Sequence, residues 1–563
     1  MTNPDTIAYF SMEIGLEPDI PTYSGGLGML AGDTVRSAAD AGLPMVAVSL
    51  AHRKGYFRQR LDAAGHQTEE PQPWPVETRL APLSALARIE IERRAVTLRA
   101  WRHDVVGHGG AVVPVILLDA DLPENDPADR GLTDFLYGGD QRYRLCQEVI
   151  LGIGGVRMLR ALGYSSIRRF HMNEGHASLL VVELGYELAQ GNGGAITDEV
   201  VAQVKPMCTF TTHTPVPAGH DQFPLDLVAR VITGYGRAFD ERAVRFCLDR
   251  VLNMTYLALD NSRYVNGVAK RHGEISRHMF AQYKVDSITN GVHAATWAAP
   301  PIAALFDRHI TAWREDNASL RYALGIPKME LWAAHEAAKQ QLLDAVRDRT
   351  GVALAGSAFT IGFARRATAW KRADLLFQDI ARLRRVNAVA GPFQVVLAGK
   401  AHPHDQSGKD LIRKLFGLIR ALEGEVRIVY LEDYDMALAR LMVAGCDLWL
   451  NTPQPPLEAS GTSGMKAAVN GVPQLSVLDG WWLEGCIEGV TGWAIGGDNH
   501  GGADDAAADA QSLYSKLELV VLPMYYRDQD RYIEIMRHAI ALNGSFFNTE
   551  RMVDQYVRKA YFA

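Results

Sequence analysis

The half of the chain from Gly351 to Asp479 alternates short β-rich runs with helix-like stretches. This alternation is typical of βαβ units, in which helices join neighbouring parallel strands. The expected strands are Ala358–Ala364, Phe393–Ala398, Val426–Leu431, Asp447–Asn451 and Gln474–Leu478. The expected helices between them are Ala369–Leu383, Asp410–Leu422, Met436–Val443 and Gly464–Val469. The pattern predicts a doubly wound α/β domain.

The N-terminal half predicts a second, more decorated α/β domain. Long inserts such as Arg60–Trp74 interrupt its β-rich runs, and one long helix is expected over Glu330–Asp348. Strands are expected at Met45–Leu50, Val112–Leu118, Met207–Thr212 and Val285–Thr289. We therefore expect a boundary near 345–355, with domains over 1–350 and 351–563, the last helices being free to cross back.

Composition excludes several classes of protein. The 563 residues are 48% hydrophobic and 22% charged, which is enough to bury large cores, and the net charge of −7 predicts no affinity for nucleic acid. The longest apolar run, Trp297–Phe306, is too short to span a membrane. The five cysteines form no CxxC pair, which predicts reduced thiols in a cytoplasmic protein: Cys146, Cys208, Cys247, Cys446 and Cys486.

Basic residues follow the first predicted strand of the C-terminal domain. Arg365 and Arg366 come directly after it, and Lys371 and Arg372 follow, with no acidic residue from Gly351 to Arg372. Ligands bind outside the carboxyl ends of strands in open parallel sheets. The cluster predicts an anion site, although a solvated helix start is the alternative.

Two loops of small residues precede predicted helices, where free backbone N–H groups suit a phosphate. One is Glu458-Ala-Ser-Gly-Thr-Ser-Gly-Met-Lys466, and the other is Ser24-Gly-Gly-Leu-Gly28. Either can be only a turn. Together with the basic cluster, they suggest two phosphates, or one phosphate held from two domains.

Several other polar residues have structural interpretations. Asn290 can belong to an Asn-Gly turn, and His213, at the end of a predicted strand, can be a hydrogen-bonded core residue. The set His171, Asn173, Glu174 and His176 lacks the i, i+4 histidine pair of a zinc motif, so no metal site is expected.

The segment Glu458–Lys466, followed by Asn470-Gly and Leu478-Asp-Gly, resembles the pyridoxal-phosphate attachment segment of the α-glucan (glycogen, starch and maltodextrin) phosphorylases. Four further matches run in the family's order: Tyr9-Phe-Ser-Met-Glu-Ile, Gly25-Gly-Leu-Gly28, Asn290-Gly with Trp297 seven residues later, and Arg366 followed by Lys371-Arg372. The resemblance implies a GT-B fold, in which two Rossmann-like doubly wound domains face an interdomain cleft. The chain resembles a short bacterial-type member.

The resemblance also implies roles for individual residues. Lys466 would carry pyridoxal 5′-phosphate, which works through its 5′-phosphate as a proton shuttle, and Arg366, Lys371 and His213 would be further catalytic residues. The cofactor-binding positions would be Arg365, Lys371, Thr462, Ser463, Gly25, Gly26, Gly28 and Trp297. The positions that bind the glucosyl unit would be His213, Asn290, Glu458, Ser460, Gly461 and Trp370.

The implied reaction is the reversible, retaining phosphorolysis of an α-1,4-glucan or maltodextrin by orthophosphate, which releases glucose 1-phosphate. A second phosphate and several cations beside orthophosphate suit this chemistry, which needs no carboxylate pair. Two alternatives remain. One is a nucleotide-sugar glucosyltransferase of the GT-B fold, similar to glycogen synthase, which would not need Lys466. The other is a non-catalytic, glucan-binding regulator.

Four residues, at three places in the chain, depart from the best-known members of that family. Ser463-Gly464 replaces Gly-Asn, Arg365 replaces a lysine, and Trp370 replaces a tyrosine whose hydroxyl meets the sugar. The strand expected over Ile7–Ser11 starts after six residues, so no N-terminal regulatory arm is expected. The sequence leaves open whether the chain forms a homodimer.

Overall fold

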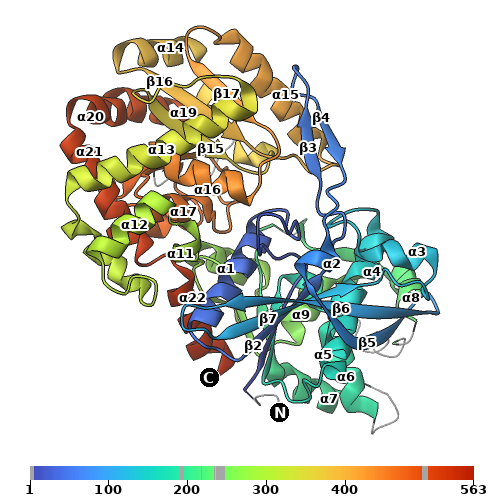
Figure 1. Ribbon diagram of the computed structural model, residues 1–563. Coiled ribbons are helices and arrows are strands. Elements are labelled where there is room, and N and C mark those ends of the chain that lie inside the picture. The colour runs from blue at the N-terminus through green and yellow to red at the C-terminus, as the bar shows by residue number, and fades with distance from the viewer. Residues whose placement is uncertain (1–4, 191–195, 217–218, 234, 236–246, 498–504) are drawn as a thin grey trace. The chain divides into compact units, whose positions relative to one another are not determined.

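The computed structural model describes residues 5–190, 196–216, 219–233, 235, 247–497 and 505–563. The chain forms two compact units, whose elements are labelled in Figure 1. Unit 1 comprises Met1–Phe57, Pro71–Thr289 and Met552–Ala563, and unit 2 comprises Arg58–Glu70 and Asn290–Arg551.

The units divide at Thr289 and Asn290, not near residues 345–355 as we expected. The reason is the packing of the long helix α13 (Lys328–Thr350), which is no linker but a layer of unit 2. It contacts α16 (Met436–Gly445) and α21 (Gln529–His538) of the same unit. At Gly445 the two backbones come so close that a Cβ atom would lie 2.8 Å from the carbonyl oxygen of Ala338.

The sheet of unit 2 has six parallel strands in the order β17-β16-β15-β18-β19-β20. Numbered along the chain, this is the order 3-2-1-4-5-6 of doubly wound nucleotide-binding folds. Its switch point lies between β15 and β18. The strands are β15 (Phe359–Ala364), β16 (Phe393–Ala398), β17 (Arg427–Leu431), β18 (Leu448–Asn451), β19 (Gln474–Val477) and β20 (Gly492–Ile495). The first five lie where the sequence placed them.

The nine-stranded sheet of unit 1 repeats this order in its parallel part, which reads β7-β2-β1-β8-β9-β13-β14. The switch point here lies between β1 and β8. Strands β5 and β6 extend the β7 edge as an antiparallel meander. The strands are β1 (Ile7–Ser11), β2 (Met45–Leu50), β5 (Ala81–Ile91), β6 (Arg94–Val106), β7 (Val112–Asp119), β8 (Arg169–Asn173), β9 (Cys208–Thr211), β13 (Tyr264–Gly267) and β14 (Asp286–Ser287).

Three of the four helices expected in the C-terminal half form near their predicted positions. These are α15 (Gln406–Ala421), α16 and α17 (Ser463–Val469). The prediction of a helix over Ala369–Leu383 was wrong, because the segment forms two short 3₁₀ turns before α14 (Ile380–Val389). Arg372 has a left-handed backbone (φ 47°) that stops a helix there. Asp379 caps α14 by accepting a hydrogen bond from the amide of Arg382.

The insert predicted over Arg60–Trp74 contains a hairpin that packs on unit 2 (Figure 1). Its strands are β3 (Arg58–Leu61) and β4 (Gln67–Glu70). The buried Gln59 side chain donates to the carbonyl of Gly399, and Gln67 both donates to and accepts from the backbone of Ala401. The hairpin is therefore hydrogen-bonded to the loop that follows β16.

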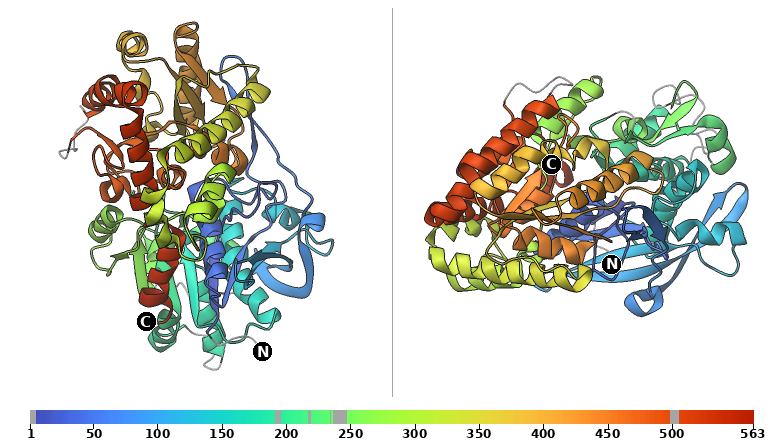
Figure 2. Two further views of the ribbon diagram at one scale, coloured as in Figure 1. Left: turned by 60° about the vertical axis from the view of Figure 1, so that its left-hand side comes forward. Right: turned by 90° about the horizontal axis from the view of Figure 1, so that it is seen from above.

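The C-terminal segment returns to unit 1, as the prediction that the last helices cross back allowed. Met552, Tyr556, Ala560 and Tyr561 belong to the core of unit 1. The hydroxyl of Tyr561 lies 2.7 Å from His171 Nδ1 on β8. Figure 2 shows this red segment beside the blue and green elements of unit 1.

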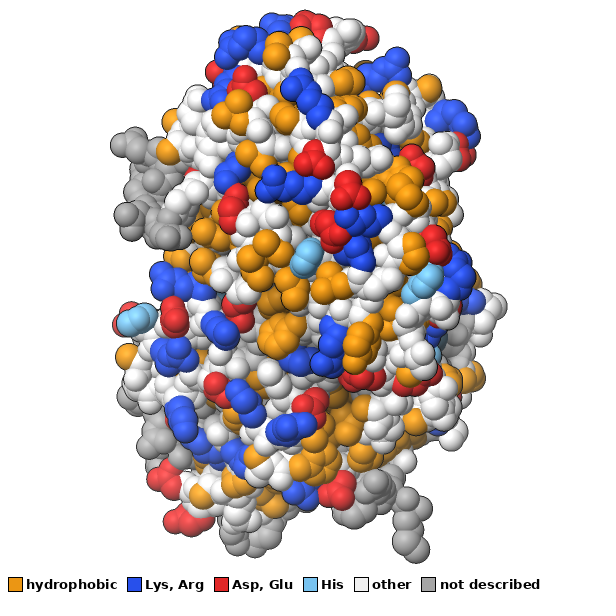
Figure 3. Space-filling model, turned by 90° about the vertical axis from the view of Figure 1, so that its left-hand side faces the viewer, with side chains coloured by type: hydrophobic (Ala, Val, Ile, Leu, Met, Phe, Trp, Pro, Cys, Tyr) orange, Lys and Arg blue, Asp and Glu red, His pale blue; other side chains and the backbone are white. Residues whose placement is uncertain are grey.

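On the face drawn in Figure 3, basic and acidic side chains are intermingled rather than gathered by sign. This distribution agrees with the modest net charge of −7. Among the described residues, no helix combines the length and the apolar character that crossing a bilayer requires.

Candidate active site

The carboxyl ends of β15 and β18 bring two cations onto one carboxylate in unit 2. Arg365 Nη2 lies 2.6 Å and Lys371 Nζ 2.5 Å from the same oxygen of Glu458. Arg365 also donates to Asn451 Oδ1 over 2.8 Å. All of these groups lie at the switch point, where open α/β sheets bind their ligands.

Arg366 differs from its neighbour Arg365 because its side chain is exposed. It makes no hydrogen bond or ion pair with the residues that the structure describes. A guanidinium in this position can bind the oxygens of an anion in a bidentate manner without breaking an existing contact.

The cluster changes the pKa values of its buried groups. Burial, then the charge of Arg365, lowers the pKa of Lys371 to about 7, against the opposing effect of Glu458. Burial alone would raise the pKa of Glu458, but Arg365 and Lys371 hold it below its ordinary value. The carboxylate is therefore ionised at neutral pH, while Lys371 is poised to exchange a proton.

A buried acid, Asp479, contacts the backbone of Glu458 in this cluster. Asp479, which follows β19, accepts hydrogen bonds from the amides of Glu458 (2.8 Å) and Gly480 (2.9 Å). Burial raises the pKa of Asp479 to about 7. The amide bond to Glu458 fixes the loop that carries Glu458, Ser460 and Gly461.

Lys466 lies in the first turns of helix α17 and contacts an aromatic ring. Its Nζ is 3.8 Å from the centroid of the Trp297 ring. Asn470 locks the two segments together by donating to the carbonyls of Trp297 and Lys466 and accepting from the amide of Ala299. Both Lys466 and Trp297 are buried.

The start of α17 shows how the chain accommodates Ser463-Gly464. Ser463 Oγ accepts a hydrogen bond from the indole of Trp449 over 3.1 Å. A Cβ atom at Gly464 would lie 1.5 Å from Gln474 Oε1, so the buried Gln474 side chain occupies the space that a larger residue would need. Thr462 is the N-cap residue, but its side chain makes no capping hydrogen bond.

Ser460 Oγ and Asn290 Oδ1 are among the buried polar atoms of unit 2 that have no hydrogen-bond partner in the part of the chain that the structure describes. An unpaired buried polar atom is costly, and a ligand is one way to satisfy it. Both residues were predicted to bind the sugar.

The glycine loop of unit 1 is organised by a buried acid. Glu13, just after β1, accepts hydrogen bonds from the amides of Ser24 (2.7 Å) and Gly25 (3.1 Å) and from the hydroxyl of Tyr137 (2.8 Å). A Cβ atom at Gly28 would lie 2.6 Å from the same carboxylate. The amide of Gly25 is thus already used, and helix α1 (Gly26–Asp40) begins at the next residue, where the first-turn amides of a helix have no acceptor within the helix itself.

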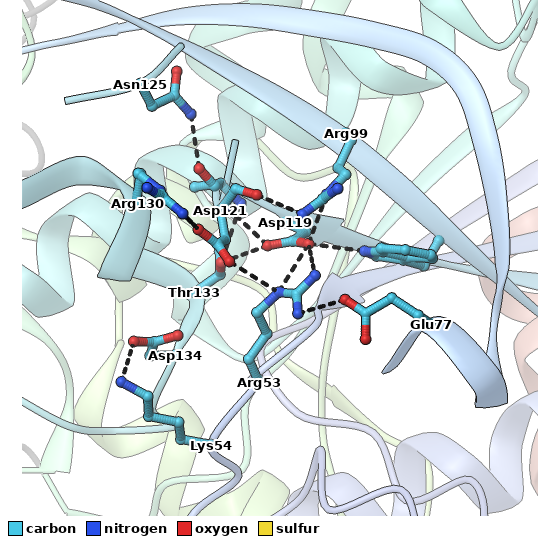
Figure 4. Close-up of polar contacts among 12 residues, drawn as sticks. Arg53, Lys54, Glu77, Arg99, Asp119, Asp121, Asn125, Arg130, Thr133 and Asp134 are labelled. Atoms are coloured by element: carbon cyan, nitrogen blue, oxygen red, sulfur yellow. Dashed lines mark hydrogen bonds and ion pairs between the residues drawn. The ribbon is translucent and has the colours of Figure 1, made fainter. Parts of the chain in front are cut away.

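A charged network around Asp119 fixes Arg53 in the segment that follows strand β2 (Figure 4). The fully buried Asp119, at the end of β7, accepts from Arg53, Arg99 and Trp101. Arg53 is thereby fixed next to His52, whose Nε2 lies 2.8 Å from the carbonyl of Met12, one residue before Glu13. The network therefore positions the strand end that carries Glu13.

His213 follows β9 in unit 1 and is held by β8 residues. Its Nε2 lies 2.7 Å from Asn173 Oδ1, and its amide donates to Glu174, whose backbone is left-handed (φ 75°). Burial lowers the pKa of His213 to about 3, so the ring is neutral and Nε2 carries the proton. Nδ1 is then an acceptor.

The structure thus gathers Arg365, Lys371 and Glu458 into one cluster and pairs Lys466 with Trp297, all within unit 2. Sequence reasoning gave no role to Asn451, Asp479 or Glu13. Asp479-Gly follows a strand end, and Glu13 follows β1, so position at the carboxyl edge was the available signal for both. Asn451 is the last residue of its strand and carries the same signal.

Comparison with known proteins adds a consistent result. The family model described as carbohydrate phosphorylase matches residues 237–488. The chain is 39% identical to the maltodextrin phosphorylase of Thermococcus litoralis, over 99% of this chain and 70% of that protein. It is 38% identical to the glycogen phosphorylase of Mycobacterium tuberculosis (99% and 71%) and 34% identical to that of Aquifex aeolicus (99% and 86%).

Proposed function

Because the chain belongs to the carbohydrate phosphorylase family, we propose that it cleaves α-1,4-glucans with orthophosphate, reversibly and with retention, to release glucose 1-phosphate. The observation that carries this proposal is the cation cluster of unit 2. Arg365 and Lys371 already hold one anionic oxygen, and the exposed Arg366 stands beside them. A nucleotide-sugar enzyme has no need of Lys466 in addition.

The proposed fold is GT-B, with each unit as one Rossmann-like half. In support, both parallel sheets have the same doubly wound strand order. The groups with predicted functions follow strands at the carboxyl ends of both sheets.

The donor set suits pyridoxal 5′-phosphate as cofactor. Lys466 supplies a primary amine against the Trp297 face, and Arg365 and Lys371 supply cations for a phosphate group. The loop from Ser460 to Gly464 offers small residues at the start of α17. When bound, the cofactor supplies a phosphate group that exchanges a proton with orthophosphate.

In this proposal Arg365, Lys371, Thr462 and Ser463 hold the cofactor phosphate. Arg366 binds orthophosphate, since its side chain is exposed and pairs with none of the residues that the structure describes. The neutral His213 and the unpaired Asn290 Oδ1 and Ser460 Oγ serve the sugar hydroxyls. Glu458, Gly461 and Trp370 complete the glucosyl pocket.

The bond changes then follow from charge and proton position. Orthophosphate donates its proton to the glycosidic oxygen, the bond from that oxygen to C1 breaks, and the glucan leaves as an alcohol. The phosphate oxygen then bonds to C1 from the face that the leaving glucan vacates, which gives retention. Arg366 stabilises the negative charge as it develops on orthophosphate.

One experiment tests this proposal. The purified chain is incubated with maltodextrin in the presence and absence of phosphate, and glucose 1-phosphate and free glucose are measured. Borohydride reduction and peptide mapping locate any bound pyridoxal group, which we expect on Lys466. Free glucose without phosphate dependence, or no sugar product from a chain that retains the cofactor, would contradict the proposal.

A further inference from the structure

The indole of Trp370 has a partner inside the cation cluster. The Nζ of Lys371 lies 3.6 Å from the centroid of the Trp370 ring. The Trp370 carbonyl accepts a hydrogen bond from the amide of Gln454 over 2.8 Å, which fixes the turn that presents the ring. Thr452 adds to this by donating to the carbonyl of Lys371. These bonds therefore hold the backbone that carries the ring against the loop that follows β18.

Lys371 needs more than one favourable contact to stay charged. It is buried, and Arg365 and Arg366 face it from the end of β15. The opposing charge is Glu458, from the loop after β18, whose contacting oxygen is shared with Arg365. Asp479, after β19, is also close enough to interact with it. An aromatic face stabilises an ammonium in such surroundings, because the face carries negative charge density and, unlike a carboxylate, has no proton to exchange.

We propose that Trp370 is a positioning residue for Lys371. The indole face contacts the Lys371 ammonium and orients it toward Glu458. The proposal rests on the proposed function in one respect: Lys371 is there a cation for a phosphate group. A planar ring, and not a hydroxyl, is the property that this position requires. Tryptophan has the strongest cation–π attraction of the three aromatic residues.

The inference predicts a change in proton binding that a purely structural residue would not cause. Without the ring face, the charged form of Lys371 is less stable, so its pKa falls further. A cation–π contact of this kind corresponds to a shift of about 0.5 to 1.5 pH units. Lys371 of a Trp370→Leu variant would therefore lose its charge at a lower pH than Lys371 of the parent chain.

Trace labelling of the full purified chain with acetic anhydride across pH 5.5 to 10, read by mass spectrometry, measures the titration of individual lysines. The variants are Trp370→Leu, Trp370→Phe and Trp370→Tyr. Lys339 is the internal control, because it is buried in the same unit against Asp447 (2.6 Å), at the start of β18 and not at its end. Binding of pyridoxal 5′-phosphate is measured on the same samples at pH 6 and pH 8.5.

We expect the Lys371 midpoint to fall by about 0.5 to 1.5 units in Trp370→Leu, by less in Trp370→Phe and least in Trp370→Tyr, while Lys339 is unchanged. The affinity of the leucine variant for pyridoxal 5′-phosphate should fall several-fold more at pH 8.5 than at pH 6. An unchanged midpoint in both the leucine and the phenylalanine variants would overturn the inference, and the milder phenylalanine variant guards against misfolding. A shifted midpoint in a chain that binds no pyridoxal 5′-phosphate would support the role of Trp370 and count against the proposed function.

Discussion

The two units share a strand order but place different chemistry at the carboxyl ends of their sheets. Unit 2 presents cations there, namely Arg365, Arg366 and Lys371. Unit 1 presents the acid Glu13 and the neutral histidine His213. Topology therefore locates a site in each sheet without deciding what the site binds. The difference assigns the strand-end cations of unit 2 to phosphate groups and His213 of unit 1 to a sugar hydroxyl, which the following experiments can break or sharpen.

The largest effect is expected from Lys466. Lys466→Ala removes the amine that lies on the Trp297 face, and we expect both the pyridoxal absorbance and the activity to fall to background. The ultraviolet-visible spectrum and the rate of glucose 1-phosphate formation measure this. Lys466→Arg keeps a positive charge without a reactive primary amine and should be equally inactive. Full activity in either variant would show that the enzyme does not depend on a cofactor bound to Lys466 of unit 2.

Acid should weaken unit 1 in particular. Burial lowers the pKa of five of its histidines to about 3 or 4: His52, His171, His176, His213 and His272. In the unfolded chain these residues bind a proton near pH 6.5, so their contribution to stability is present above pH 6.5 and is lost as the pH falls. Each of these histidines lowers the stability of the fold by about 1.4 kcal/mol for every pH unit below 6.5, until the pH reaches its pKa in the folded state.

Hydrogen exchange measured between pH 7 and pH 5, corrected for the intrinsic rate, compares the two sheets directly. Peptides that cover β8 and β9 should lose protection at a higher pH than peptides that cover β15 and β16. Equal loss in both sheets would show that the buried histidines do not control the acid stability of unit 1.

A smaller effect is expected from Arg366. Arg366→Ala removes a charge-assisted contact of about 1.5 to 3 kcal/mol with orthophosphate, so the KM for phosphate should rise about 10- to 100-fold. Because the side chain is exposed and unpaired, the melting temperature should not change. Lys371→Ala is the matched variant, and it should lose cofactor more readily than phosphate affinity. Equal cofactor loss in both variants would show that Arg366 and Lys371 do not bind two different phosphate groups.

The smallest effect is expected from His213 in unit 1. His213→Ala removes one hydrogen bond to a sugar hydroxyl, typically about 1 kcal/mol, so the KM for maltodextrin should rise several-fold. The KM for phosphate should stay the same. A comparable rise in the phosphate KM would blur the proposed distinction between the two units.

The sequence predicts the strands well and the partners of side chains poorly. Ile7–Ser11, Met45–Leu50 and Phe393–Ala398 form strands with the expected bounds because local runs of apolar residues decide them. The ion pair between Lys371 and Glu458 joins residues that are far apart in the chain, so no local pattern contains it. The sequence indicated the hairpin that contains Gln59 only as an insert, because the residues to which it is hydrogen-bonded lie after β16.

The distribution of unit 1 along the chain has a consequence for the order of folding during synthesis. N-terminal domains usually fold first as they leave the ribosome. Here the core of unit 1 also contains Tyr556 and Tyr561, which are translated only after the whole of Asn290–Arg551. Until then His171 lacks its Tyr561 partner, and the nascent sheet keeps an apolar surface open. Unit 1 can therefore complete its core only after the whole of unit 2 has been translated.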